Sequence, residues 1–192
     1  MEEVENSFYV HFLYEMLNFV MKKYEKGGSA AAASAADAEG AAAANHESLL
    51  SEVEQLGGEL GKRACDKLAI GCKEKHNNQI EKTRFLCVVV WPYLFNYRVT
   101  TLKSNGQGAY HIIDNNNEFL ARLSSDDPES PEFLHKVSVY KAFLQGIIKG
   151  VLYNLGGEGP IKCELKLMPQ ENSAYMRLVV LLNYMEKRKV KD

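Results

Sequence analysis

Apolar side chains recur every three or four positions in four stretches of the chain. The stretches are 4–24, 47–68, 80–102 and 131–155. This spacing places the apolar residues on one face of a helix, so each stretch is predicted to be helical. Short polar or glycine-containing segments separate the four stretches, as expected for connections between packed helices.

Local signals support the boundaries and shape of these helices. Acidic residues crowd the start of the first helix, where the helix dipole favours negative charge, and Gly27 and Gly28 end it. Ser130 and Pro131 are a typical cap and first residue for the fourth helix. Pro92 lies inside the third stretch and predicts a kink there.

Alternating apolar and polar residues predict strands in the remaining segments. Residues 161–168 alternate cleanly, and 175–182 follow after a turn, which indicates an antiparallel hairpin. A second hairpin is predicted from 108–114 and 118–124 around the turn residues 115–117. The fold class is therefore α+β, with a four-stranded antiparallel sheet of two hairpins and helices packed on one face.

Two features of the helices suggest close contacts. The first helix carries apolar and aromatic residues over more than one stripe, which suits either an ordinary core helix or one that also presents a face to a partner. Gly57 and Gly61 in the second helix are four apart, as are Gly146 and Gly150 in the fourth. Glycine lowers helix stability, so this spacing indicates a tight helix–helix contact.

The composition changes in two short segments. Residues 27–45 are mainly alanine and glycine and offer no large side chain to a core, so we expect a flexible insertion with some helix content. Residues 185–192 form a basic tail. The remaining pattern is continuous, and the 192 residues are expected to form a single domain.

Charge and hydropathy exclude two classes of function. The net charge of −2 lacks the basic excess of most nucleic-acid-binding proteins. The longest uncharged apolar run, residues 85–97, is shorter than the roughly 20 residues that span a bilayer. The acidic start does not resemble a secretory signal, so we expect a cytoplasmic protein with peripheral membrane contact at most.

Candidate chemistry is sparse. The sequence contains no phosphate-binding loop, no nucleophile elbow and no His-Glu-x-x-His motif. Cys65, Cys72 and His76 fall within twelve residues, but their spacing does not match that of common zinc sites. We therefore expect no catalytic residues, no metal and no cofactor.

Three groups of residues resemble the small subunits of the transport protein particle (TRAPP), in the subunit 6 branch of that Bet-three-like family. The resemblance covers most of residues 1–26 and 46–183. The matching motifs are Leu56-Gly57-x-x-x-Gly61, then Phe85-Leu86-Cys87 followed by Trp91, Phe95 and the run Leu102–Tyr110, and finally Phe143 with Gly146-x-x-Lys149-Gly150-Val151-Leu152-Tyr153.

The resemblance implies a non-catalytic subunit of a vesicle-tethering complex that acts in transport from the endoplasmic reticulum to the Golgi. Such a subunit pairs with a subunit-3-like partner, contacts other TRAPP subunits and helps nucleotide exchange on a Rab-type GTPase. It is expected at Golgi and endoplasmic-reticulum membranes, and as a possible homodimer when isolated. The implied partner interface lies on the first two helices: Phe8, Phe12, Leu13, Leu17, Leu49, Val53, Leu56, Gly57 and Gly61.

Two other functions stay open at this stage. One is a module that binds a small hydrophobic or acyl ligand, since the subunit 3 branch carries an acylated cysteine before its central helix. The approximate counterpart in this chain, near Ile80 and Glu81, has no cysteine. The other is an enzyme whose site the sequence does not reveal.

Overall fold

The computed structural model describes residues 11–22, 24, 35–70, 78–117, 120, 130–156, 160–169 and 176–184. An N-terminal helix occupies residues 11–22. The labelled elements are α2 (Ala35–Ala69), α3 (Gln79–Phe85), the π-helical segment η1 (Leu86–Val90), α4 (Trp91–Phe95), β1 (Thr101–Ser104), β2 (Ala109–Asp114), α6 (Pro131–Asn154), β3 (Ile161–Pro169) and β4 (Met176–Tyr184).

The four strands form one antiparallel sheet in the order β1-β2-β4-β3. This confirms the predicted fold class. The β3–β4 hairpin has the predicted strands, with Leu165 opposite Val180. Its alternation also matches the prediction, because Ile161, Cys163 and Leu165 are buried while the residues between them are exposed.

The other predicted hairpin is wrong. β2 pairs with β1 on one side and with β4 on the other, so residues 118–124 are not its neighbour in the sheet. The turn between β1 and β2 uses Gly106 and Gly108, whose φ angles of 74° and 82° suit glycine. The side chain of Asn105 closes this turn by accepting hydrogen bonds from the backbone N–H groups of Gln107 and Ala109. Of residues 118–124, only Leu120 is described, and it is helical.

The helix predicted over 80–102 ends early, at Phe95. Asn96 follows it in the left-handed region with φ of 59°, a conformation that asparagine tolerates and that stops a helix. Pro92 does not end the helix. The preceding turn widens instead, and the Trp91 N–H bonds the carbonyl of Leu86, five residues back. β1 begins five residues after Asn96, at Thr101.

α2 begins at Ala35, twelve residues before the predicted start at 47. Residues 35–45 of the alanine-rich segment are therefore helical, in keeping with the high helix propensity of alanine. Residues 27–34 and the predicted basic tail at 185–192 lie outside the described residues.

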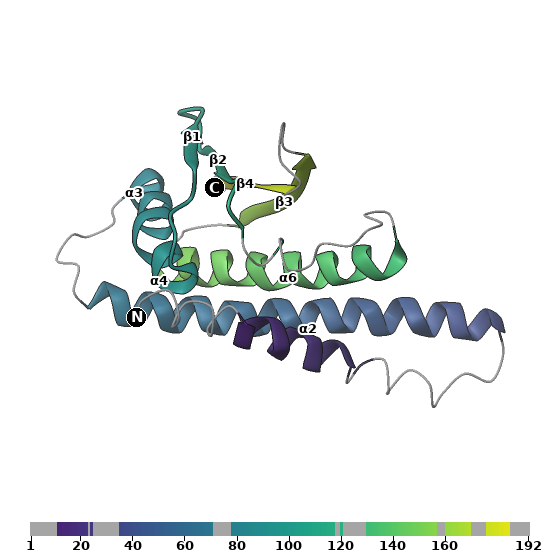
Figure 1. Cartoon of the computed structure of the whole chain (residues 1–192). Coiled ribbons are helices and arrows are strands. Elements are labelled where there is room, and N and C mark those ends of the chain that lie inside the picture. Colours follow the sequence, from purple (N-terminus) through teal and green to yellow (C-terminus); the bar gives the residue numbers. More distant parts are fainter. Residues whose placement is uncertain are drawn as a thin grey trace, which may run out of the picture.

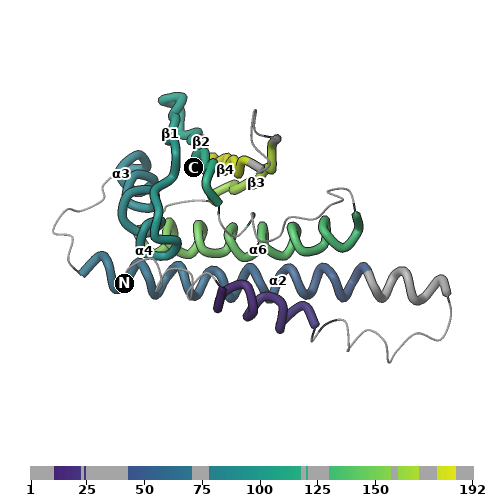
Figure 2. Tube along the Cα trace, in the orientation of Figure 1, coloured from purple at the N-terminus to yellow at the C-terminus, as the bar shows by residue number. Residues whose placement is uncertain are grey.

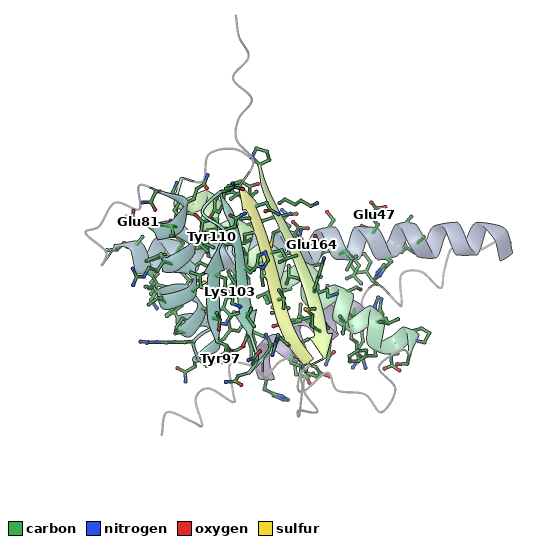
Figure 3. The ribbon with its side chains drawn as sticks, turned by 90° about the horizontal axis from the view of Figure 1, so that it is seen from above. Glu47, Glu81, Tyr97, Lys103, Tyr110 and Glu164 are labelled. Atoms are coloured by element: carbon green, nitrogen blue, oxygen red, sulfur yellow. The ribbon has the colours of Figure 1, made fainter. Side chains whose placement is uncertain are left out.

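The elements stack in layers. Figure 1 shows the sheet above α6, α2 below α6, and the N-terminal helix below α2. Figure 2 shows that α2 and α6 run side by side in the same direction. α6 carries buried residues all around its circumference, as expected for a helix between a sheet and another helix. Figure 3 looks onto the opposite face of the sheet, where Lys103 and Glu164 are exposed.

Candidate interaction surface

The N-terminal helix packs antiparallel against α2 and completes the core on that side (Figure 1). Leu13, Leu17 and Met21 are almost fully buried, and they join a core cluster that includes Leu49 and Val53 of α2. At the end of this helix, the Tyr24 hydroxyl donates a hydrogen bond to the carboxylate of Glu52. Leu13, Leu17, Leu49 and Val53, all predicted as partner contacts, are thus already enclosed by the chain itself.

Three large apolar side chains of the same helix pair are exposed, among polar residues such as Glu15 and Gln55. Phe12 and Phe19 are 56% and 71% exposed, and Leu56 on α2 is 38% exposed. Phe12 and Phe19 are seven residues apart, close to two helical turns, so they share one face. That face is roughly opposite to Leu13 and Leu17. Exposed aromatic side chains are typical of the centres of protein–protein interfaces, and Phe19 was not predicted.

Gly57 and Gly61 contact α6 of the same chain. A Cβ atom on Gly57 would lie 2.1 Å from the carbonyl oxygen of Phe143, and one on Gly61 would lie 2.3 Å from that of Ile147. The glycines of α6 make the same kind of contact with α2. A Cβ atom on Gly150 would lie 2.2 Å from the carbonyl oxygen of Gly58. This glycine seam, made by Gly57, Gly61, Gly146 and Gly150, confirms the predicted tight helix–helix contact. It occupies a face that the resemblance assigned to a partner.

Polar side chains join the two helices along the edges of the seam. Lys149 Nζ of α6 lies 2.8 Å from Glu54 Oε1 of α2, and Asn154 Nδ2 donates to Asp66 Oδ1 at 2.7 Å. The ion pair is partly exposed, so it contributes up to about 1 kcal/mol. Both residues of the ion pair line an open groove of about 640 Å³, together with Gly58 and Tyr153. These pairs hold the parallel register of α2 and α6.

A second exposed apolar cluster lies at the C-terminal end of α2. Ile70 is the most exposed large apolar side chain among the described residues, and Val88 and Tyr93 on η1 and α4 are about half exposed. Lys67 Nζ donates to the Tyr93 hydroxyl at 2.9 Å and lies 5.2 Å from the centre of its ring. Sequence reasoning missed this cluster, because its members come from separate elements and follow no single helical stripe.

An open groove of about 710 Å³ lies between α3 and the β1–β2 turn, near Ile80 and Glu81, where the resemblance implied the approximate counterpart of an acylated cysteine. Ile80 lines it and is half exposed, and Lys82 Nζ donates to the carbonyl of Gly156 at 2.6 Å. The nearest cysteine along the described chain, Cys87, is buried within η1. The groove therefore presents no described thiol for acylation.

The described cysteines are buried free thiols: Cys65, Cys87 and Cys163. Burial raises the pKa of Cys87 to about 12 and the pKa of Cys163 likewise to about 12. Such thiols are poor nucleophiles and poor metal ligands at neutral pH. Cys72 and His76, the other members of the sequence cluster, lie outside the described residues.

None of the helices in the described ranges has the length and apolar composition to cross a bilayer. The features of the described surface that stand out are exposed apolar side chains on helices. Their arrangement suits contact with other protein chains.

The chain is similar to known proteins in sequence and in fold. Residues 9–179 match the family model of the transport protein particle (TRAPP) component. Trafficking protein particle complex subunit 6B of Homo sapiens is 26% identical over 120 residues, which are 62% of this chain and 73% of the human protein. Subunit 6A of Mus musculus is 26% identical over 120 residues, covering 62% of this chain and 72% of the mouse protein.

A solved structure with the same fold is a trafficking protein particle complex subunit 3 from Naegleria fowleri covalently bound to palmitic acid. The TM-score is 0.56 at 14% identity, over 93% of this chain and 98% of that chain. The two sequence relatives named above are subunits 6B and 6A, and subunit 6 is the branch that the sequence motifs predicted.

Proposed function

This chain belongs to the TRAPP component family and is a TRAPP complex subunit, and from this premise we propose that it pairs with a subunit-3-like partner through its N-terminal helix and α2. In this role it is a non-catalytic part of a vesicle-tethering complex in transport between the endoplasmic reticulum and the Golgi. It helps to scaffold nucleotide exchange on a Rab-type GTPase, and it reaches Golgi and endoplasmic-reticulum membranes through the assembled complex.

The observation that carries the proposal is the exposure of three large apolar side chains on these two helices, Phe12, Phe19 and Leu56, which make up the proposed apolar face. A phenylalanine that is 71% exposed leaves most of its apolar surface in water, and covering that surface on association is favourable by roughly 25 cal/mol per Å². The rigid helix pair beneath the face is fixed by the core and by the glycine seam, so little conformational entropy is lost when a partner binds.

The proposed contact differs in detail from the set implied by the resemblance. Phe12 and Leu56 belong to both, and Phe19 is added. Leu13, Leu17, Leu49 and Val53 support the face from behind, while Gly57 and Gly61 set the position of α2 on α6. Phe8 lies outside the described residues, so its part in the contact stays a prediction.

Co-expression with subunit 3 of the same organism, followed by size-exclusion chromatography with light scattering, is the direct experiment. We expect a one-to-one heterodimer from the unmodified chain and its loss in the double variant Phe12→Asp, Phe19→Asp. The matched control is Leu134→Asp, since Leu134 is also an exposed apolar residue but lies on α6. An unchanged heterodimer in the double variant would contradict the proposed face.

The same chromatography on the isolated chain addresses self-association. Because the apolar face lacks its cover when subunit 3 is absent, we expect a concentration-dependent homodimer that the double variant abolishes. A strictly monomeric unmodified chain at high concentration would remove self-association from the proposal and leave the heterodimer intact.

A further inference from the structure

Two histidines from different helices meet where α2 and α6 begin to run together. His46 lies on α2 and His135 on α6, and both are half-buried. Their ring centroids are 4.8 Å apart and the ring planes are tilted by 40°. Neither residue takes part in the glycine seam or in the apolar face, so the function proposed above does not account for this pair.

Ser138 of α6 lies beside the His46 ring. Its hydroxyl donates to the backbone carbonyl of His135 at 2.7 Å and lies 3.4 Å from Nε2 of His46. The hydroxyl has one proton, and it is donated to the His135 carbonyl. The Ser138 oxygen can therefore only accept from His46, so Nε2 of His46 carries the N–H that donates to it. The other nitrogen of the His46 ring then keeps its lone pair. A ligating histidine commonly donates its second N–H to a neighbouring oxygen in this way.

The spacing of the rings suits two imidazoles bound to one metal ion. A metal–nitrogen bond of about 2.0–2.1 Å puts the centre of each ring roughly 3.2 Å from the metal. For an N–metal–N angle between about 90° and 109°, the two ring centres are then roughly 4.5–5.2 Å apart. The observed 4.8 Å falls in this range, and rotation about the metal–nitrogen bonds accommodates the tilt.

We propose that His46 and His135 form a two-histidine site for a late first-row divalent cation such as Zn²⁺ or Cu²⁺. Neutral imidazole is a favoured ligand of these ions, whereas Mg²⁺ and Ca²⁺ prefer oxygen. Across the described ranges, no three His, Cys, Asp or Glu side chains are arranged to hold a metal. The described residues therefore supply two ligands, and water fills the remaining positions.

The two described carboxylates nearest to the histidines in sequence have other positions or partners. Glu132, three residues before His135, forms an ion pair with Lys136 at 2.6 Å. Glu47 is exposed, and Figure 3 shows it on the part of α2 that extends beyond the strands. A metal at the histidine pair would tie α2 to α6 upstream of the seam, next to the alanine-rich part of α2. This inference does not depend on membership of a TRAPP complex.

The experiment uses the full chain without a histidine tag and measures thermal unfolding with increasing ZnCl₂. Binding to the folded state alone raises the unfolding midpoint as the Zn²⁺ concentration rises. We expect this increment in the unmodified chain, its reversal by a chelator, and at least a tenfold loss of Zn²⁺ affinity in His46→Gln and in His135→Gln. His111→Gln is the matched control, since His111 is a single exposed histidine on β2.

Electron paramagnetic resonance with Cu²⁺ separates ligation from a structural role. We expect signals from two coordinated nitrogens in the unmodified chain and in His111→Gln, and from no more than one in either of the other variants. A variant that merely loosens the helices lowers the midpoint in metal-free buffer and leaves the Zn²⁺ increment in place. A Zn²⁺ increment that persists in His46→Gln, or none at millimolar Zn²⁺ in the unmodified chain, would overturn the proposal.

Discussion

A Cβ atom on Gly146 would lie 2.0 Å from the carbonyl oxygen of Glu54 on the neighbouring helix. Real Cβ atoms do not approach backbone atoms this closely, so only glycine fits at this position without moving α2 away from α6. Close approach also brings Cα–H groups near carbonyl oxygens, a weak attraction that recurs at tight helix–helix contacts. The packing of α2 on α6 thus depends on the absence of side chains at the seam.

We expect Gly146→Ala to destabilise the protein. The new methyl group must push apart two backbones, and overpacking of a core typically costs about 1–3 kcal/mol. The better helix propensity of alanine returns up to about 1 kcal/mol, so the net effect is a loss. Urea unfolding followed by circular dichroism measures the change in the free energy of unfolding.

Gly58→Ala is the matched control on α2. A Cβ atom there would have its nearest contact at 3.8 Å, to the carbonyl oxygen of Gly146, which is an ordinary packing distance. This variant gains helix propensity without a clash, so we expect a stability equal to or up to about 1 kcal/mol above that of the unmodified chain. Equal destabilisation by both substitutions would contradict the close contact.

Asp114, at the end of β2, is buried and linked to Tyr97. It accepts hydrogen bonds from the Tyr97 hydroxyl at 2.8 Å and from Asn117 Nδ2 at 3.2 Å. Burial raises the pKa of this carboxyl, and the hydrogen bonds from Tyr97, Asn116 and Asn117 offset only part of the rise. The folded state therefore binds a proton at Asp114 more readily than the unfolded state does.

The raised pKa of Asp114 predicts how the stability of the protein changes with pH. The contribution of Asp114 is fully present below its unfolded pKa near 3.8 and is lost as the pH rises through the raised folded pKa. We expect the free energy of unfolding of the unmodified chain to fall, relative to that of Asp114→Asn, as the pH rises through this window. Urea unfolding of both proteins at several pH values measures the difference, and a difference independent of pH would contradict it.

Tyr97→Phe provides a companion measurement. It removes a hydrogen bond that favours the ionised carboxylate, so the pKa of Asp114 in the folded state rises further. The pH window in which stability is lost should therefore move upward in this variant. No movement of the window would mean that Tyr97 does not stabilise the carboxylate.

The buried thiols give a third prediction. With a pKa of about 12, the Cys87 and Cys163 thiols are each ionised in roughly one molecule in ten thousand at pH 8. We expect both to resist iodoacetamide in the folded protein and to react once urea unfolds it. Peptide mass spectrometry reports each cysteine separately, and rapid labelling of Cys87 in the folded chain would show that η1 opens.

The helices and the β3–β4 hairpin were predictable because one local pattern specifies each of them. The period of apolar residues in 131–155 and the alternation in 161–168 correspond to faces that are buried in the structure. The boundary at Phe95 was missed because a single left-handed residue, Asn96, ends a run whose apolar character continues. The partner of β2 was missed because pairing depends on Asn105, Gly106 and Gly108, a turn signal that competes with residues 115–117.

The polar residues at 115–117 have a role that no local pattern reveals. Asn117 is buried, and its side chain exchanges hydrogen bonds with the Tyr140 hydroxyl of α6 and bonds Asp114. The segment looks like a solvent-exposed turn in sequence because asparagines usually are exposed. The contact joins residues 23 positions apart, so only the tertiary structure reveals it.

The candidate site was predictable at the level of elements and only partly at the level of residues. The resemblance to the TRAPP small subunits implied an interface on the first two helices, but periodicity cannot tell which of two apolar faces meets the chain's own core. Leu13 and Leu17 face inward while Phe12 and Phe19 face outward, because the helix docks on α2 in one orientation. The glycines were predicted as a close contact, and their partner is a helix about 90 residues further along the chain.

Substitutions at Val53 and Leu56 on α2 distinguish a core position from a position on the proposed partner surface. Val53 is fully buried, so Val53→Asp places a charge in the core and should unfold the isolated chain or cost several kcal/mol. Leu56 is 38% exposed, and Leu56→Asp should change the free energy of unfolding by no more than about 0.5–1 kcal/mol. Circular dichroism with urea unfolding of the two isolated variants measures this contrast. For the folded Leu56→Asp chain, isothermal titration calorimetry with subunit 3 should then give an affinity at least tenfold weaker than that of the unmodified chain. Full affinity in Leu56→Asp would place the partner elsewhere on the molecule, and the exposed cluster of Ile70, Val88 and Tyr93 would be the next surface to substitute.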